Sequence, residues 1–144
     1  MLDKQVILEK EIDLIQSCIT RMSNNSFLIK GWTITITTVI LPLLYNKAEK
    51  SIIIPVGIIM IICFWYLDPY FLRLERLYRW KYDWVIKNRL YNEQCYYDLN
   101  PYNNKMWPIE NDKLPNIICI MFSKTIFPIY LLLFVLFLIY TIKF

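Results

Sequence analysis

The sequence predicts an all-α membrane protein, and two observations lead to this fold class. Hydrophobic residues make up 57% of the 144 residues, above the roughly 45–50% typical of a soluble domain. They also gather in blocks, at residues 27–45, 51–67 and 125–142, which approach the length that a helix needs to cross a bilayer. We therefore expect helices throughout, three of them transmembrane.

Residues 1–25 are expected to form an N-terminal amphipathic helix over residues 2–23. Apolar side chains recur there at alternating intervals of four and three, which is the seam of a heptad repeat. Such a stripe can pack on the rest of the protein or join copies of the chain, and the pattern fits both. Polar residues 23–26 are expected to break the helix, with Ser26 capping the next one. The candidate oligomerisation residues are Leu8, Ile12, Ile15, Ile19 and Met22.

Residues 26–68 are expected to form a transmembrane hairpin with a polar turn at residues 46–50. Its second arm is short unless the helix continues through Asp68 and Pro69. The first arm carries four threonines in six residues. These hydroxyls can mediate close helix packing, or line a water path where several copies meet, and both interpretations stay open. The candidate pore-lining residues share one side of the helix: Lys30, Thr33 and Thr37.

Residues 69–116 are expected to form a cytoplasmic segment that starts with a basic and aromatic helix over residues 69–93. Between residues 70 and 90 there are six Lys/Arg and two Asp/Glu, an excess equal to the net charge of +4 for the whole chain. A loop or short helices should follow, and residues 117–144 should hold the third transmembrane helix. Bases are fewer in the turn and at the C-terminus, so the positive-inside rule places residues 69–116 and the N-terminus in the cytoplasm.

The basic helix offers the densest set of groups that can bind an anion. Arginine forks bind phosphates through two hydrogen bonds, and aromatic rings stack on bases. Bases and aromatic rings beside a membrane also anchor a protein to anionic headgroups without any specific ligand. The sequence leaves both readings open. The candidate ligand-binding residues are Arg73, Arg76, Arg79, Lys81 and Trp80.

The sequence contains no recognisable catalytic or metal-binding pattern. The chain has no histidine, so it lacks the commonest general base and metal ligand. Its four cysteines include no Cys-x-x-Cys pair, and no glycine-rich phosphate loop occurs. We therefore expect a protein that is not an enzyme and uses no cofactor or metal, with lipids and further copies of itself as partners rather than a nucleic-acid duplex.

Three stretches of the sequence carry a resemblance to a known family. Residues 21–32 (RMSNNSFLIKGW), 64–79 (FWYLDPYFLRLERLYR) and 122–126 (FSKTI) resemble landmarks of small membrane proteins from bacterial defence loci. The chain is similar to the membrane effector of Hailong-type antiphage systems. That resemblance implies a homo-oligomeric channel-like effector in the bacterial inner membrane. It also implies control by a nucleotide oligomer from a partner nucleotidyltransferase, and depolarisation of the infected cell.

The functional expectation is therefore a channel-like effector of four or more copies, controlled by a nucleotide-type ligand. Two alternatives remain. The chain could be a non-conducting membrane anchor or scaffold that recruits a cytoplasmic partner, or a holin-like protein that forms lesions without a ligand. The neighbouring gene would separate these hypotheses, because a nucleotidyltransferase favours the gated effector and a lysin favours the holin.

Overall fold

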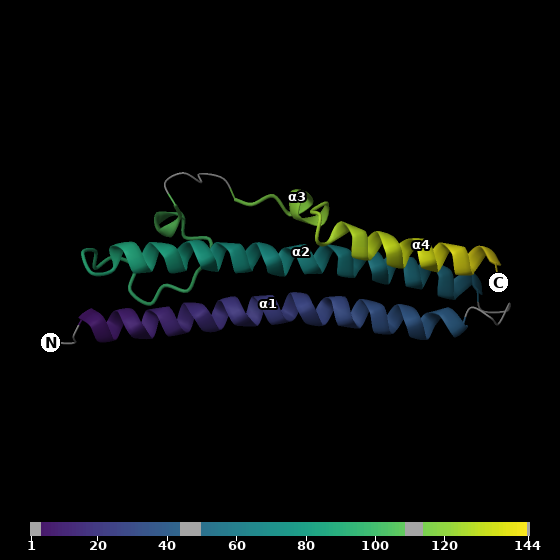
Figure 1. Ribbon diagram of the computed structural model, residues 1–144, viewed down its shortest axis with the longest axis horizontal. Coiled ribbons are helices and arrows are strands. Elements are labelled where there is room, and N and C mark those ends of the chain that lie inside the picture. Colours follow the sequence, from purple (N-terminus) through teal and green to yellow (C-terminus); the bar gives the residue numbers. More distant parts are fainter. Residues whose placement is uncertain (1–3, 44–49, 109–113, 144) are drawn as a thin grey trace. The chain divides into compact units, whose positions relative to one another are not determined.

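The computed structural model describes residues 4–43, 50–108 and 114–143 (Figure 1). Within these ranges the chain is helical and contains no strand, so the all-α prediction is confirmed. Among the described residues one helix, α2, is long and apolar enough to cross a membrane; its most apolar window of 18 residues has a mean hydropathy of 2.1. The turn predicted at residues 46–50 lies outside the described residues except for Lys50, which begins α2.

Helix α1 runs without interruption from Lys4 to Leu43. The predicted break at residues 23–26 is therefore wrong. Ser26 does not cap a helix: it is 2% exposed, and its hydroxyl donates a hydrogen bond to the carboxylate of Asp68. Serine is only mildly unfavourable in a helix interior, so a tertiary hydrogen bond and burial outweigh its local preference.

Helix α2 extends from Lys50 to Asn88 and continues through Pro55 and Pro69. A proline inside a helix donates no backbone hydrogen bond, which costs about 3 kcal/mol. Asp68 and Pro69 are both buried, so packing holds the helix together where the sequence changes from apolar to basic. The continuation that the second arm needed to reach a membrane-spanning length is present.

The remaining helices are shorter. A loop with the 3₁₀ helix η2 (Asn104–Met106) follows α2. Helix α3 (Ile117–Met121) precedes α4 (Phe127–Lys143), which has 17 residues and carries Pro128 in its first turn, where a proline is tolerated.

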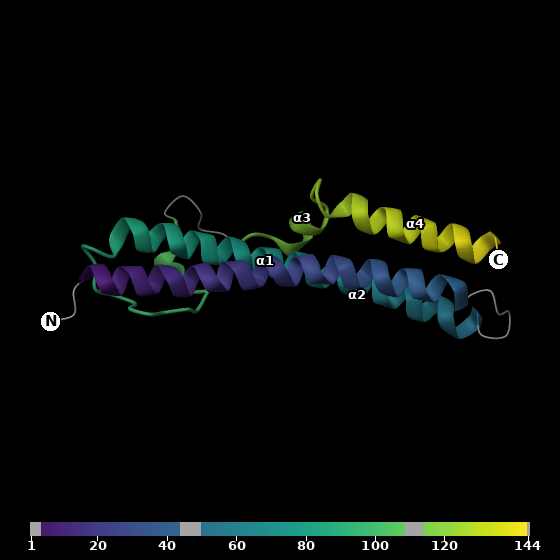
Figure 2. The ribbon, with the colours of Figure 1, turned by 60° about the horizontal axis from the view of Figure 1, so that its bottom comes forward.

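The chain divides into two compact units, and α1 and α2 contribute residues to both. Unit 1 comprises Met1–Asn24 and Phe71–Asn116, and unit 2 comprises Asn25–Tyr70 and Ile117–Phe144. In each unit the segments of α1 and α2 run side by side in opposite directions, and in unit 2 α4 packs along α2 (Figures 1 and 2).

The heptad stripe of α1 lies in the core of unit 1. Ile15, Ile19 and Met22 are 2%, 6% and 8% exposed in the single chain, and Leu8 and Ile12 are half-buried. In the single chain the stripe therefore packs against other residues of unit 1, and the role of these residues in oligomerisation stays a prediction.

Candidate functional site

A wholly buried carboxylate, that of Asp68, lies in the interior of unit 2. It is 0% exposed and accepts hydrogen bonds from Ser26 Oγ and from Lys30 Nζ, the latter at 2.8 Å. The Tyr130 hydroxyl lies 3.4 Å from its second oxygen. An unpaired carboxylate in such surroundings would be very unfavourable, and the lysine ammonium supplies the compensating charge. We call Ser26, Lys30, Asp68 and Tyr130 the Asp68 cluster.

Three helices bring the Asp68 cluster together. Ser26 and Lys30 stand one turn apart on α1, and Lys30 Nζ also donates to Ser26 Oγ at 2.8 Å. Asp68 comes from α2, and Tyr130 comes from the first turn of α4. One carboxylate therefore links every long helical segment of unit 2. A movement of any of the three segments has to break at least one of these bonds.

The predicted pore-lining residues share the inward face of α1. Thr33 and Thr37 are 1% and 5% exposed, and Thr33 Oγ1 donates to the Ile29 carbonyl at 2.7 Å. Thr33 and Thr37 line a narrow groove together with Gly57 and Phe137, and this groove has no room for a water molecule. The inward face of α1 in unit 2 is thus polar, and in the single chain it is sealed.

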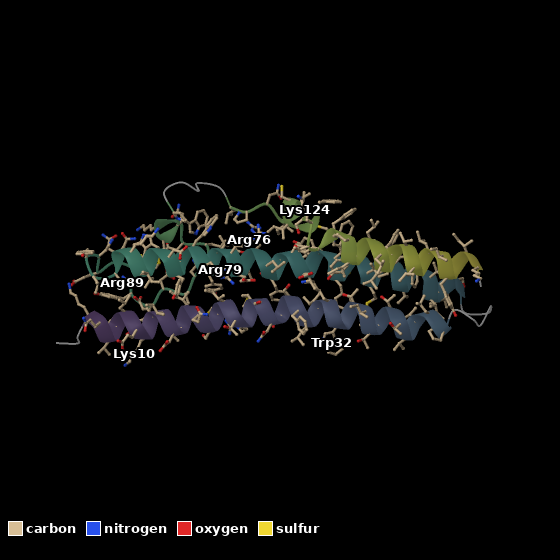
Figure 3. All side chains as sticks on the ribbon, in the orientation of Figure 1. Lys10, Trp32, Arg76, Arg79, Arg89 and Lys124 are labelled. Carbon is tan, nitrogen blue, oxygen red and sulfur yellow. The ribbon has the colours of Figure 1, made fainter. Side chains whose placement is uncertain are left out.

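The three arginines of the predicted ligand site lie on α2 in unit 1. Arg76 and Arg79, labelled in Figure 3, are both exposed. Arg79 forms an ion pair with Glu75 at 2.7 Å. Arg73 is half-buried, and among the described residues its Nε atom is a buried donor without a hydrogen-bond acceptor. Trp80 is half-buried and packs edge-on against Trp107, with ring centroids 6.1 Å apart.

Lys81 does not join these arginines. It is 1% exposed, and its ammonium donates to the backbone carbonyls of Asp98 and Asn100 and lies 3.5 Å from the Asp98 carboxylate. Burial lowers the pKa of Lys81, and the nearby Asp98 carboxylate partly opposes that shift. Lys81 thus anchors the loop that follows α2, which leaves its charge unavailable to a ligand.

A second buried ion pair, which the sequence analysis did not identify, organises unit 1. Arg89 is 1% exposed and Glu11 3% exposed, and Arg89 Nη2 donates to Glu11 Oε1 at 2.9 Å. Arg89 also donates to the carbonyls of Gln94 and Cys95, at 2.6 and 3.0 Å. The Tyr97 amide donates to the same Glu11 carboxylate at 2.6 Å. The pair therefore holds a loop whose backbone turns into the left-handed region at Cys95 and Tyr97.

Both ion pairs left a signal in the sequence. Glu11 lies three residues after Leu8 and four before Ile15, at the edge of the apolar stripe, where a surface charge would not be expected. Lys30 and Asp68 carry opposite charges at the same polar end of the two predicted hairpin arms.

Comparisons of the chain with protein-family models, curated proteins and solved structures found no match in any of the three.

Proposed function

We propose that the chain is a membrane protein whose unit 2 lies within the bilayer. The observation that carries this proposal is the distribution of polarity in unit 2. Its buried groups include Asp68, Ser26, Thr33 and Thr37, whereas many of its exposed side chains are large and apolar. In water this arrangement would be highly unfavourable, but in lipid it is what the hydrophobic effect and the cost of exposed polar groups demand. The most exposed of these side chains are Phe27, Trp32, Val39, Ile52, Ile118, Leu132 and Ile142.

The activity we propose is that of a homo-oligomeric, channel-like effector. Its support is the polar face formed by Lys30, Thr33 and Thr37, which would supply hydroxyls and charge to a path through the membrane. Because this face is sealed against Gly57 and Phe137 in the single chain, conduction requires the helices of unit 2 to separate. The Asp68 cluster is the contact that such a separation would have to break.

Control of the channel is proposed to come from an anionic, nucleotide-type ligand at Arg73, Arg76 and Arg79. The supporting observations are the unsatisfied Nε donor of Arg73 and the exposed side chains of Arg76 and Arg79, three and six residues further along α2. A phosphate would complete the hydrogen bonds of that fork. The resemblance to defence effectors adds a nucleotide oligomer as ligand, the bacterial inner membrane as location, and unit 1 on the cytoplasmic side.

A non-conducting anchor is the second candidate, and the sealed groove favours it. Ion conductance across planar bilayers that contain the purified chain separates the two. Current that appears or disappears when a cyclic or linear oligonucleotide is added supports the channel. Silence under every ligand condition, from protein shown by gel filtration to be intact, leaves the anchor.

The ligand site is tested with two triple variants of equal charge change. R73E/R76E/R79E should abolish the response to nucleotide while the protein still inserts into membranes. The matched control K10E/K87E/K105E alters three exposed lysines of unit 1 away from the site and should keep the response. Equal loss in both variants would show that overall charge, not this site, governs control.

A further inference from the structure

A cavity of about 160 Å³ lies between α2 and α4 in unit 2 and takes no part in the Asp68 cluster's polar contacts. It is separate from the sealed groove beside the threonines, and among its lining side chains the hydroxyl of Tyr130 turns toward Asp68. Its remaining surface is hydrocarbon or aromatic ring. The lining includes Ile62, Trp65, Phe127, Tyr130, Leu131 and Phe134.

The apolar lining indicates that an occupant of this cavity is apolar. A buried water needs two to four polar partners, whereas a cavity of about 150 Å³ lined by Leu, Ile and Phe stays dry and binds small hydrocarbons. The cavity of unit 2 matches that size and lining. Leu131 and Ile62 are 46% and 50% exposed, so the cavity also borders the outer surface, from which a chain can enter.

One end of the cavity carries the groups that a lipid headgroup requires. Lys124 is exposed on the turn before α4, three residues from Phe127, and Figure 3 shows it at the junction of α3 and α4. Ser123 and Thr125 place two hydroxyls beside it, 3.3 Å apart. A cation and hydroxyls at the end of an apolar slot complement a phosphate joined to an acyl chain.

Aromatic side chains mark the same level as a membrane–water interface. The Trp65 indole donates to the Met121 carbonyl at 3.3 Å, and its ring packs against Phe122 and Phe127, with centroids 5.3 and 6.2 Å away. Tryptophan with its ring in hydrocarbon and its N–H on a polar group is typical of that level. The geometry points to one anionic phospholipid, with an acyl chain in the cavity and its phosphate at Lys124.

An acyl chain in this cavity would contact the ring of Tyr130 on the side away from Asp68. Tyr130 is 2% exposed and donates to Asp68 across the interior of unit 2. The bound chain therefore supports Tyr130 in the orientation that completes the Asp68 cluster. Loss of the lipid removes packing from one side of that ring and weakens the link between α4 and α2.

The test measures lipid retained by the purified full-length chain in mild detergent, by native mass spectrometry. Phosphatidylglycerol and phosphatidylcholine with identical acyl chains are added in equal amounts. We expect one retained lipid per chain, with phosphatidylglycerol preferred about fivefold, which is what one lysine near the surface supplies. K124Q should abolish that preference and keep the bound chain.

Filling the cavity provides the decisive comparison. L131W should lower retention by about tenfold, because the indole takes the place of several methylene groups. L132W is the matched control, since Leu132 is the next residue on α4, is 61% exposed and does not line the cavity. I62W and I59W form a second such pair on α2, in case L131W does not fold.

Two results overturn the proposal. The first is equal lipid retention in L131W and L132W, and likewise in I62W and I59W. The second is a dimer mass that disappears only in L131W, which would assign the cavity to a second copy of the chain. The inference rests on the membrane location proposed above, and the two can fail separately. If unit 2 does not lie in a bilayer, the chain leaves membranes in alkaline carbonate. If only the lipid site is wrong, it stays in membranes without retaining a specific lipid.

Discussion

The ammonium of Lys30 and the carboxylate of Asp68 lie 2.8 Å apart inside unit 2, but the two side chains are unequally exposed. The Lys30 side chain is 24% exposed and that of Asp68 is not exposed at all. Because the lysine stem is long and flexible, Lys30 can turn toward a polar environment, whereas Asp68 cannot. The pair is therefore an asymmetric contact, in which the carboxylate depends on the lysine more than the lysine depends on it.

This asymmetry predicts different costs for removing each partner. K30M leaves a buried carboxylate without a counter-charge and should lower the free energy of unfolding by about 3–5 kcal/mol. D68N leaves a cation that can reach solvent, so a smaller loss of about 2 kcal/mol is expected. Unfolding of the purified chain in detergent, followed by circular dichroism, provides the measurement.

The double variant K30M/D68N is the control for this order. With both charges gone, its stability should exceed that of K30M alone, since a buried pair replaced as a unit is often neutral. Additive losses in the double variant would show that the two side chains do not interact energetically.

The position of Asp68 illustrates where sequence reasoning succeeds and where it stops. Helix content and the length of the apolar arms follow from composition and spacing, so α2 and α4 appear close to their expected limits. Local preference failed at Ser26, where a side chain suited to a helix cap instead bonds to a carboxylate 42 residues away. That hydrogen bond depends on tertiary packing, which no local pattern contains.

Glu11 is predicted to stabilise unit 1 through Arg89. E11Q leaves the guanidinium of Arg89, 1% exposed, without a counter-charge, and should reduce stability by about 3–5 kcal/mol. The loop after α2 should then open, because Arg89 and Glu11 hold it by its backbone. Hydrogen exchange of the Tyr97 amide reports this directly.

E9Q is the matched control for E11Q. Glu9 lies two residues away on the same helix, is exposed, and loses the same charge on substitution. Stability and exchange in E9Q should resemble those of the unmodified chain. If both variants behave alike, the Glu11–Arg89 contact contributes nothing beyond net charge.

Asp98 should give unit 1 an acid-sensitive contribution to stability. Burial raises the pKa of Asp98, but hydrogen bonds from Asn103 and Asn100, together with the Lys81 ammonium, outweigh it and hold the pKa below 3.8. A carboxyl group with a depressed pKa stabilises the fold above its unfolded pKa, and that contribution disappears as the pH falls through the folded value.

The measurement compares thermal unfolding of the unmodified chain and D98N between pH 7 and pH 2. At pH 7, D98N should be less stable by about 1.5–3 kcal/mol, the value of hydrogen bonds to a charged group. The difference should shrink below pH 3.8. A gap that stays constant across this range would exclude Asp98 as its source. D83N, at an exposed carboxylate of α2, controls for the loss of one charge.

Part of the site could not be predicted from the sequence, because several buried positions of α1 and α2 carry polar side chains. Buried positions of α1 follow the spacing of a seam, yet Glu11, Ser26 and Thr33 belong to it as well as apolar residues. On α2 the buried face includes Lys81 at the same spacing as Leu74, Tyr78 and Val85, and Arg89, directly after the end of α2, continues that spacing. A search for apolar residues alone assigns such charges to the surface. Position on the seam, not residue type, indicates that they are buried.

The two glycines of the chain provide a test of helix packing in unit 2, because substitution by alanine has opposite expected signs. A Cβ atom at Gly57 on α2 would clash with Phe137 Cζ on α4, and the Phe137 ring is 0% exposed. The ring cannot move without displacing its neighbours, so G57A should destabilise the chain by about 1–3 kcal/mol.

At Gly31 on α1 a Cβ atom meets nothing within 4 Å among the described residues. G31A should therefore stabilise the chain by up to about 1 kcal/mol, the helix-propensity difference between the two residues. Unfolding in detergent measures both, and F137L in the G57A background should recover part of the loss because it removes the clashing ring atoms. If G57A is as stable as G31A, α2 and α4 do not approach each other as closely as this contact requires.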